Sequence, residues 1–442
     1  MKSTQKEGKE KVLLVIVDFK NDRQRWPVQE VLEEMEDLIA GCGGEVIERM
    51  ICPLEKASAT YLIGSGRVQD IAAAVSHLKI DTVVFSYDLR GSQQRNLEET
   101  IKTKTIDRTQ LILDIFARHA TSKEGKMQVE LAQLEYLLPR LVGHGIELSR
   151  LGGGIGTLGP GETKLEMDRR RIAERIARLR HELKEVTTQR ALKRKQRKDK
   201  GVPAVALVGY TNAGKSTLMN TLTQADQLTR ETLFTTLDSL SRQFLLPNHQ
   251  KIIISDTVGF MHDLPHHLIE AFKATLEEVR EADLLLHVID VSHPHFHHLR
   301  DAVKVVLKEL DSSEKPTVVV FNKIDRLPAG FLWPEAPRGE EENRQGLDQF
   351  QGGQNHTVCI SAKTGENVPI LVENISRMLS SMVEEINVDI PINRMDLVNL
   401  AHEQGQVYSV KYYADTVNIR ALVPTQVAGK FYKYDIHSRK EG

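Results

Sequence analysis

Eight consecutive residues near the middle of the chain have the types and spacing of a loop that binds phosphate. They read GYTNAGKS and comprise Gly209, Tyr210, Thr211, Asn212, Ala213, Gly214, Lys215 and Ser216. An apolar run, 204–208, precedes them and a predicted helix, 216–222, follows, which is the context that this motif requires. Glycines allow backbone N–H groups to point at a phosphate, a lysine supplies positive charge, and a serine hydroxyl is a hard ligand for Mg²⁺. The motif predicts a nucleotide site in which Lys215 is catalytic and Ser216 binds the metal.

A second motif, DTVG, follows the predicted strand 251–255. It consists of Asp256, Thr257, Val258 and Gly259. An aspartate at this point can hold the water shell of Mg²⁺, and the Gly259 N–H can bind a γ-phosphate and so take part in catalysis. The motif alone is more often a plain turn, but it lies about 40 residues after Lys215, where a nucleotide site needs it.

A third motif predicts recognition of a guanine base. It consists of Asn322, Lys323, Ile324 and Asp325, directly after the predicted strand 317–321. The Asp325 carboxylate can accept from N1–H and the 2-amino group of guanine, whereas adenine offers neither donor and would leave the carboxylate unpaired. Asn322 either contacts the opposite edge of the base or braces the loop. Ser361, Ala362 and Lys363 follow the last strand, and this segment can supply a backbone N–H to guanine O6.

With these motifs in this order, each at the end of a strand, the chain resembles the guanine-nucleotide-binding GTPases of the translation-factor-related class. The segments 129–140 (VELAQLEYLLPR), 153–170 with its GPGETKLEMDRR, 209–216, 234–238 (FTTLD) and 256–260 (DTVGF) narrow the resemblance to the HflX family, over about residues 10–435. In that family a threonine of switch I ligates Mg²⁺ when GTP is bound. The matching nucleotide-binding segment comprises Phe234, Thr235, Thr236, Leu237 and Asp238, and we assign Thr236 as the catalytic metal ligand, with Thr235 as the alternative.

The resemblance implies a Mg²⁺-dependent enzyme that hydrolyses GTP to GDP and uses the two states as a binding switch. The implied partner is the large (50S) ribosomal subunit with its rRNA, bound by a monomer that splits or rescues stalled ribosomes or acts in protein synthesis. The alternative is a factor for ribosome assembly or RNA remodelling that uses GTP as an affinity switch. A further alternative is that the N-terminal region binds ATP. It is disfavoured because the sequence before residue 151 contains no second phosphate-binding motif.

One residue departs from the broader GTPase pattern. Phe260 follows Gly259, where many GTPases have a glutamine that orients the attacking water. A phenyl ring cannot orient water by hydrogen bonding. We therefore expect slow intrinsic hydrolysis that rises when a partner orders the site.

Strand and helix patterns divide the chain into four segments and predict an α/β protein. Residues 1–151 form an N-terminal α/β domain, 152–200 a glycine-rich loop, a basic helix and a linker, 201–384 a Ras-like GTPase domain, and 385–442 a small C-terminal α/β domain. The expected strands are 11–18, 45–51 and 82–85 in the first domain; 204–208, 243–246, 251–255, 284–289, 317–321 and 357–360 in the GTPase domain; and 407–410 and 416–421 at the end. The expected N-terminal helices are 28–40, 66–78 and 127–141.

The basic segment concentrates charge on an otherwise acidic chain. Residues 164–200 hold 15 Lys and Arg against 6 Asp and Glu, a net charge of +9 in a protein whose total is −2. Apolar residues from 165 to 186 follow a heptad pattern, which predicts a helical hairpin or short coiled coil, and 193–200 has the composition of a charged linker. The charge indicates either a polyanion-binding surface or a solvated helix face. A G-x-G-x-x-G at 154–159 follows no strand, which excludes a dinucleotide site.

Composition sets the remaining bounds. The chain has 442 residues, of which 40% are hydrophobic and 27% charged, which excludes a wholly disordered chain. The chain has three scattered cysteines and an N-terminus without an apolar signal, which predicts a cytoplasmic protein. It has no long apolar run, which predicts that no segment spans a membrane. Four histidines, His293, His295, His297 and His298, favour an exposed loop over a metal site. The aromatic residues after 407 favour a small hydrophobic core over a surface that stacks on RNA bases.

Overall fold

The computed structural model describes residues 9–20, 26–141, 160–199, 201–224, 240–248, 250–262, 273–328 and 357–435. The chain divides into two compact units. The described residues of the first unit lie within 1–185, and those of the second lie within 186–442. Among the described residues, none of the helices has the length and apolar composition needed to cross a membrane.

The first unit contains a four-stranded parallel sheet with the order β2-β1-β3-β4. Its elements are β1 (Glu10–Phe19), α1 (Val28–Gly41), β2 (Gly44–Leu54), α2 (Ser65–Leu78), β3 (Thr82–Phe85), α3 (Gly91–Ile101), β4 (Lys104–Asp107) and α4 (Arg108–His119). Residues 12–16 of β1 are all buried, which is typical of a parallel strand covered on both faces. The three predicted strands and the helices α1 and α2 are confirmed.

The elements predicted from the sequence do not include α3, β4 or α4. β4 has only four residues, too few to show a period. α4 does carry an amphipathic pattern, which the sequence analysis overlooked. Leu111, Ile112, Ile115 and Phe116 are buried, while Gln110, Asp114, Ala117 and Arg118 lie on the less buried face of the helix.

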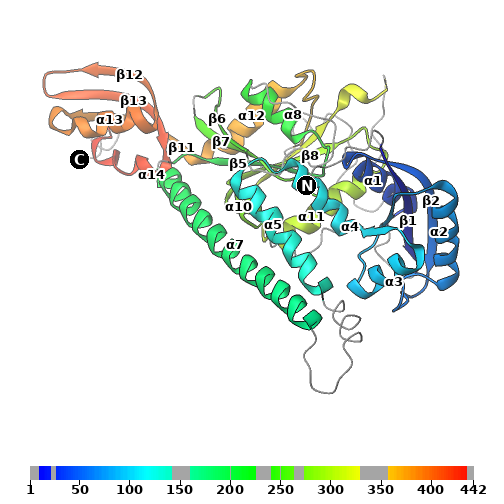
Figure 1. Ribbon diagram of the computed structural model, residues 1–442. Coiled ribbons are helices and arrows are strands. Elements are labelled where there is room, and N and C mark those ends of the chain that lie inside the picture. Colours follow the sequence, from blue (N-terminus) through cyan, green and yellow to red (C-terminus); the bar gives the residue numbers. More distant parts are fainter. Residues whose placement is uncertain are drawn as a thin grey trace. The chain divides into compact units, whose positions relative to one another are not determined.

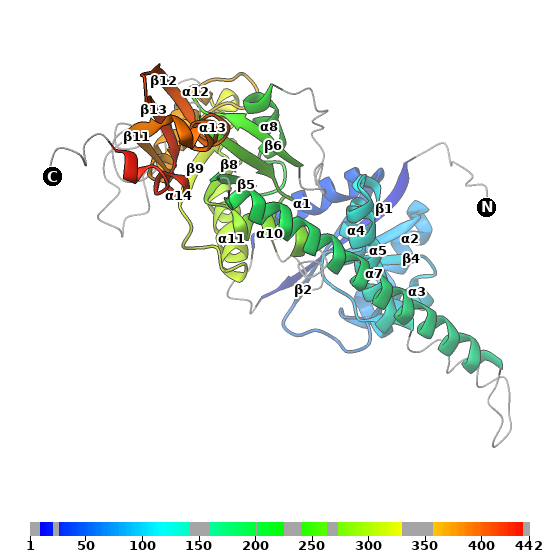
Figure 2. The ribbon, with the colours of Figure 1, turned by 90° about the vertical axis from the view of Figure 1, so that its left-hand side faces the viewer.

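Two further helices of the first unit lie side by side. α5 (Lys123–Leu137) is followed by the short turn η1 (Leu138–Leu141), and α7 (Pro160–Asp199) is a single long helix (Figure 1, Figure 2). Arg175 of α7 donates to both oxygens of Glu130 at 2.7 and 2.8 Å, and Ile176 and Leu179 of the predicted apolar seam are buried. The seam therefore packs as part of a helical pair with α5.

The linker predicted at 193–200 is wrong, because α7 continues to Asp199. In the second unit its last turns are ion-paired to α10 (Lys273–Glu281). Arg194 Nη2 lies 2.8 Å from Glu277 Oε2, and Lys198 Nζ lies 2.8 Å from Glu281 Oε2. Partners on a neighbouring helix hold the charged end of α7 in helical form, which composition alone does not reveal.

The second unit contains a six-stranded sheet with the order β10-β9-β8-β5-β7-β6 (Figure 1). Its elements are β5 (Ala204–Gly209), α8 (Lys215–Thr223), β6 (Leu240–Leu245), β7 (Lys251–Asp256), α10, β8 (Leu284–Asp290), α11 (Phe296–Glu309), β9 (Thr317–Asn322), η2 (Ile324–Arg326), β10 (Thr357–Cys359) and α12 (Val368–Met378). Only β6 runs antiparallel among these strands. All six predicted strands are confirmed. The carboxyl ends of β5, β7, β8 and β9 meet at one edge, where all of the described nucleotide motifs begin or end.

The end of the chain forms a small three-stranded antiparallel sheet with the order β11-β13-β12. Its elements are η3 (Ser380–Met382), β11 (Val383–Pro391), η4 (Ile392–Arg394), α13 (Met395–Gln404), β12 (Gln406–Tyr412), β13 (Thr416–Pro424), α14 (Thr425–Ala428) and η5 (Tyr432–Tyr434). Phe431 is fully buried and Tyr434 packs on the same core, as predicted. The expectation is wrong for Tyr408, Tyr412, Tyr413 and Tyr432, which are exposed.

Candidate functional site

The phosphate-binding loop connects β5 to the first residue of α8. Lys215 is 6% exposed, and its Nζ donates to the carbonyl oxygens of Gly209 at 3.0 Å and Tyr210 at 2.9 Å. Burial lowers the pKa of the Lys215 ammonium to about 8, and the nearby Asp256 carboxylate partly offsets this. Its charge is thus held inside the loop at the N-terminus of a helix, where anions bind.

Gly214 gives the loop its last turn. Its φ is +93°, a conformation that only glycine adopts readily, and a Cβ there would lie 2.3 Å from Nδ2 of Asn322. The loop and the third motif therefore approach each other too closely for any side chain at residue 214.

Two oxygen-bearing side chains meet beside the loop. Ser216 Oγ donates to Asp256 Oδ2 at 2.6 Å, and Asp256 is 2% exposed at the end of β7. A hydroxyl and a carboxylate are hard oxygen donors, the kind that Mg²⁺ prefers. The donor set of these two residues therefore fits the predicted metal.

The second motif runs directly along the phosphate-binding loop. Thr211 N–H donates to the Phe260 carbonyl at 2.7 Å, and Phe260 N–H donates to the Gly209 carbonyl at 3.1 Å. A Cβ on Gly259 would lie 2.8 Å from Thr211 Cα and 3.2 Å from Lys215 Nζ. Gly259 therefore lies directly against the phosphate-binding loop, beside the Lys215 ammonium.

The same segment is anchored by side chains of its own. Thr257 Oγ1 donates to the Leu207 carbonyl at 2.6 Å, and the His262 N–H donates to the Tyr210 hydroxyl at 3.0 Å. Phe260 is 2% exposed. Its ring is part of the interior and offers nothing that could hold a water molecule.

The third motif is held by Asn322, which is 2% exposed. Its Nδ2 donates to the Ala213 carbonyl at 2.9 Å, and its Oδ1 accepts from the Ala362 N–H at 2.9 Å. Of the two roles that the sequence leaves open, the structure gives Asn322 the bracing one. One amide side chain ties the phosphate-binding loop to the 361–363 segment.

Asp325 is the exposed member of the motif, and a serine orients it. The Ser361 hydroxyl is fully buried and donates to Asp325 Oδ1 at 2.6 Å. The same hydroxyl accepts from the Thr364 N–H at 3.2 Å. The carboxylate therefore has one oxygen fixed by the protein, with its other oxygen, Oδ2, available to a base.

The structure does not describe every predicted residue. Phe234, Thr235, Thr236, Leu237 and Asp238 lie outside the described residues, as does most of the glycine-rich loop. The predicted phosphate, metal and base residues outside that segment all lie at the carboxyl edge of the six-stranded sheet. Sequence reasoning missed Asp290, which directly follows the predicted strand 284–289 and ends β8 at this same edge. The rule used for Asp256 and Asn322 would have found it.

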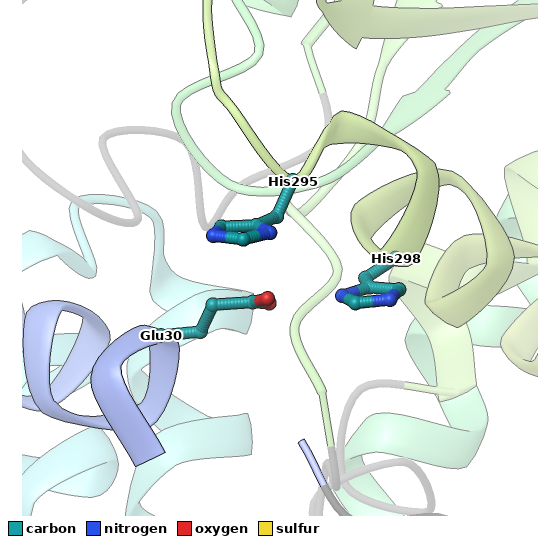
Figure 3. A group of neighbouring side chains, drawn as sticks. All are labelled: Glu30, His295 and His298. Carbon is teal, nitrogen blue, oxygen red and sulfur yellow. The ribbon is translucent and has the colours of Figure 1, made fainter. Parts of the chain in front are cut away.

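The histidine segment is exposed in part, as the sequence favours, because His297 and His298 are exposed, but three of its four histidines lie at the start of a helix rather than in a loop. His295 is the N-cap of α11, and His297 and His298 lie in its first turn. The rings of His295 and His298 stack, with centroids 5.8 Å apart and planes 4° from parallel (Figure 3). The histidines thus belong to the start of a helix.

Four family profiles match successive parts of the chain. Their descriptions are GTP-binding GTPase N-terminal for residues 29–117, GTP-binding GTPase Middle Region for 119–197, 50S ribosome-binding GTPase for 204–323 and HflX C-terminal domain for 347–423. Together they cover most of the chain, and β1 (Glu10–Phe19) precedes the first matched residue.

Several curated proteins named GTPase HflX are similar over most of their length. The protein of Caldanaerobacter subterraneus subsp. tengcongensis is 41% identical, over 96% of this chain and 93% of its own. That of Escherichia coli K12 is 40% identical, over 86% of both chains. A crystal structure of a GTP-binding protein from Sulfolobus solfataricus in complex with GDP is 25% identical over 84% of this chain and 99% of its own. Its TM-score of 0.42 is too low to inform the site.

Proposed function

The chain belongs to the HflX family of GTPases, and we propose that it binds the large ribosomal subunit in its GTP state and loses that affinity on hydrolysis. It is a GTP hydrolase that binds guanine nucleotides. The observation that carries the nucleotide-dependent part of the proposal is the pair of hydrogen bonds made by Asn322, which joins the phosphate-binding loop to the 361–363 segment. The matched profile for residues 204–323 is named for 50S binding, and residues 164–200 offer nine net positive charges to rRNA.

In the proposed mechanism, the phosphate-binding loop exchanges internal contacts for contacts to GTP. Lys215 leaves the carbonyl oxygens of Gly209 and Tyr210 and binds β- and γ-phosphate oxygens. Gly259 donates its N–H to the γ-phosphate. Lys215, being buried, is not shielded by water, so its charge acts strongly on the negative charge that develops during transfer.

The proposed metal site consists of Ser216 and Thr236, with Asp256 bonded to the metal's water shell. Mg²⁺, when bound, neutralises charge on the phosphate oxygens. The contact between Ser216 and Asp256 supports this assignment because it places both oxygens at one point beside the loop. Thr236 is assigned from the family resemblance.

The proposed base site depends on Asp325. Its carboxylate accepts from N1–H and the 2-amino group of guanine, while the 361–363 segment supplies a backbone N–H to O6. The Ser361 hydroxyl supports this role because it fixes one oxygen of the carboxylate before the base arrives.

Phe260 makes the proposed enzyme depend on a partner. Its buried ring leaves the site without the side chain that orients water in many GTPases. We expect slow hydrolysis by the free protein and faster hydrolysis when purified large subunits are added. Equal rates with and without subunits in a single-turnover assay would contradict this dependence.

Sedimentation tests the proposal. The protein is centrifuged through sucrose with purified 70S ribosomes and either GDP or a non-hydrolysable GTP analogue. We expect it to pellet with large subunits only with the analogue, and free subunits to appear if it separates ribosomes. Binding restricted to immature large particles would indicate the assembly alternative, and no binding would refute the proposal.

A charge-matched pair of variants tests the basic helix. Changing Arg169, Arg170 and Arg171 to Gln removes three exposed charges from α7 and should weaken sedimentation about tenfold or more. The control changes Arg300, Lys304 and Lys308 of α11 to Gln, which removes three positive charges from a different helix. Equal losses in both variants would show that the effect is one of net charge alone.

A further inference from the structure

An ion pair joins the guanine motif to β8, a strand that carries none of the recognised motifs. Asp290 ends β8, and its Oδ2 lies 2.6 Å from Lys323 Nζ. Both side chains are largely buried, with 15% of the aspartate and 13% of the lysine exposed. Asp290 and Asn322 face each other in the β8–β9 register, so the pair connects the ends of two neighbouring strands.

The other oxygen of the same carboxylate is also occupied. Asp290 Oδ1 accepts from the N–H of Ser292 at 3.0 Å and from its hydroxyl at 2.6 Å. Three donors therefore fix the orientation of Asp290. A carboxylate held this way gives Lys323 one preferred partner.

The backbone at Lys323 makes this restraint necessary. Its φ is +68°, in the left-handed region that non-glycine residues rarely adopt. The bend sends Asn322 inward to Ala213 while Asp325, two residues later, faces outward. The Lys323 ammonium contacts Asp290, while Asp325 lies two residues further along the same segment.

An ammonium that paired with Asp325 would compete with the base. Guanine needs the Asp325 carboxylate as an acceptor, and a charge-assisted bond from lysine would occupy it. Pairing with Asp290 removes this competitor.

We infer that Asp290 is a positioning residue of the guanine site, which holds Lys323 away from Asp325 so that Asp325 stays free for N1–H and the 2-amino group. The inference rests on the proposed function of Asp325. It predicts that removing the charge of Asp290 weakens guanine recognition only while Lys323 is present.

A double-mutant cycle tests this coupling. Affinities for GDP and for IDP, which lacks the 2-amino group, are measured by calorimetry for wild type, Asp290→Asn, Lys323→Met and the double variant. We expect Asp290→Asn to bind GDP about tenfold more weakly, which corresponds to about 1.4 kcal/mol, and to narrow the GDP-to-IDP affinity ratio. The double variant should match Lys323→Met within about twofold, because no ammonium remains to block Asp325.

The controls separate this coupling from general damage. Asp301→Asn changes an exposed aspartate that is paired to Lys304 at 3.6 Å and should leave both affinities unchanged. Two results would overturn the inference. One is a loss of GDP affinity in the double variant equal to the product of the losses in the two single variants. The other is a GDP-to-IDP affinity ratio for Asp290→Asn that equals the wild-type ratio. If wild type bound no GDP, or if Asp325→Asn bound it normally, the proposed function itself would fail. Normal GDP binding by Asp290→Asn alone would refute only the role of Asp290.

Discussion

Asn322 is the residue whose loss should damage the site most, and the size of the effect follows from its contacts. Asn322→Ala removes a donor from the Ala213 carbonyl and an acceptor from the Ala362 N–H, and both residues are 2% exposed. A buried polar group without a partner costs about 1–3 kcal/mol. With two such groups, we expect the free energy of unfolding to fall by about 3 kcal/mol and the Tm by about 6–12 °C.

Thermal unfolding followed by circular dichroism, without nucleotide, measures this loss. The matched control is Asn374→Ala, because the Asn374 Nδ2 also donates to a backbone carbonyl, that of Ile370 at 2.9 Å, but on the exposed side of α12. It should change the free energy of unfolding by less than about 0.5 kcal/mol. A Tm for Asn322→Ala within about 1 °C of wild type would refute the bracing role. Retained GDP affinity in that variant would show that the brace is structural and does not serve the nucleotide.

Three other changes test separate parts of the same unit. Gly214→Ala should lower GDP affinity at least about tenfold in calorimetry, because its Cβ would lie 2.3 Å from the Asn322 amide and its φ is +93°; unchanged affinity would contradict the tight approach. Asp325→Asn should shift preference from GTP towards xanthosine triphosphate, since the amide donates where the carboxylate accepted, and equal GTP binding in competition assays would defeat the base assignment. Burial lowers the pKa of His287 to about 3 from an ordinary value of 6.5, and among the described residues its Nε2 has no hydrogen-bond partner. The folded state therefore disfavours protonation. The stability from neutral His287 should be complete above pH 6.5 and fall by about 1.4 kcal/mol per pH unit below it, and urea unfolding at pH 7 and 5.5 should show a smaller fall for His287→Leu.

Much of the fold could be predicted because its strands are short apolar runs bounded by polar turns. β5 and β8 follow from this pattern, since parallel strands covered on both faces are apolar throughout, whereas the antiparallel β6 alternates. The pattern fails where burial depends on partners remote in sequence. The end of α7 has the composition of a linker, and only its ion pair between Arg194 and Glu277 shows that it is helical.

The aromatic residues near the C-terminus show the same limit. Phe431 and Tyr412 both count as aromatic residues in the composition, yet Phe431 is fully buried and Tyr412 is 69% exposed. Tyr412 is the last residue of β12, whereas Phe431 follows α14 and packs into the core of the small sheet. Composition predicts that a core exists, but only the tertiary fold decides which rings fill it.

The candidate site was easier to predict than the fold around it, because each motif residue has a chemical role that its type declares. Lysine, serine and aspartate at strand ends predict phosphate, metal and base contacts without knowledge of distance. The residue type does not reveal the role of the residues that set the geometry of the site. Asn322 is compatible with two roles until its bonds to Ala213 and Ala362 are seen, and Asp290 resembles any strand-ending aspartate until its contact with Lys323 is seen. Contact residues can therefore be predicted from chemistry, whereas positioning residues require the register between strands. Asp290 could thus be recognised from the sequence as a residue at the same edge as the ends of β7 and β9, but its contact with Lys323 could not.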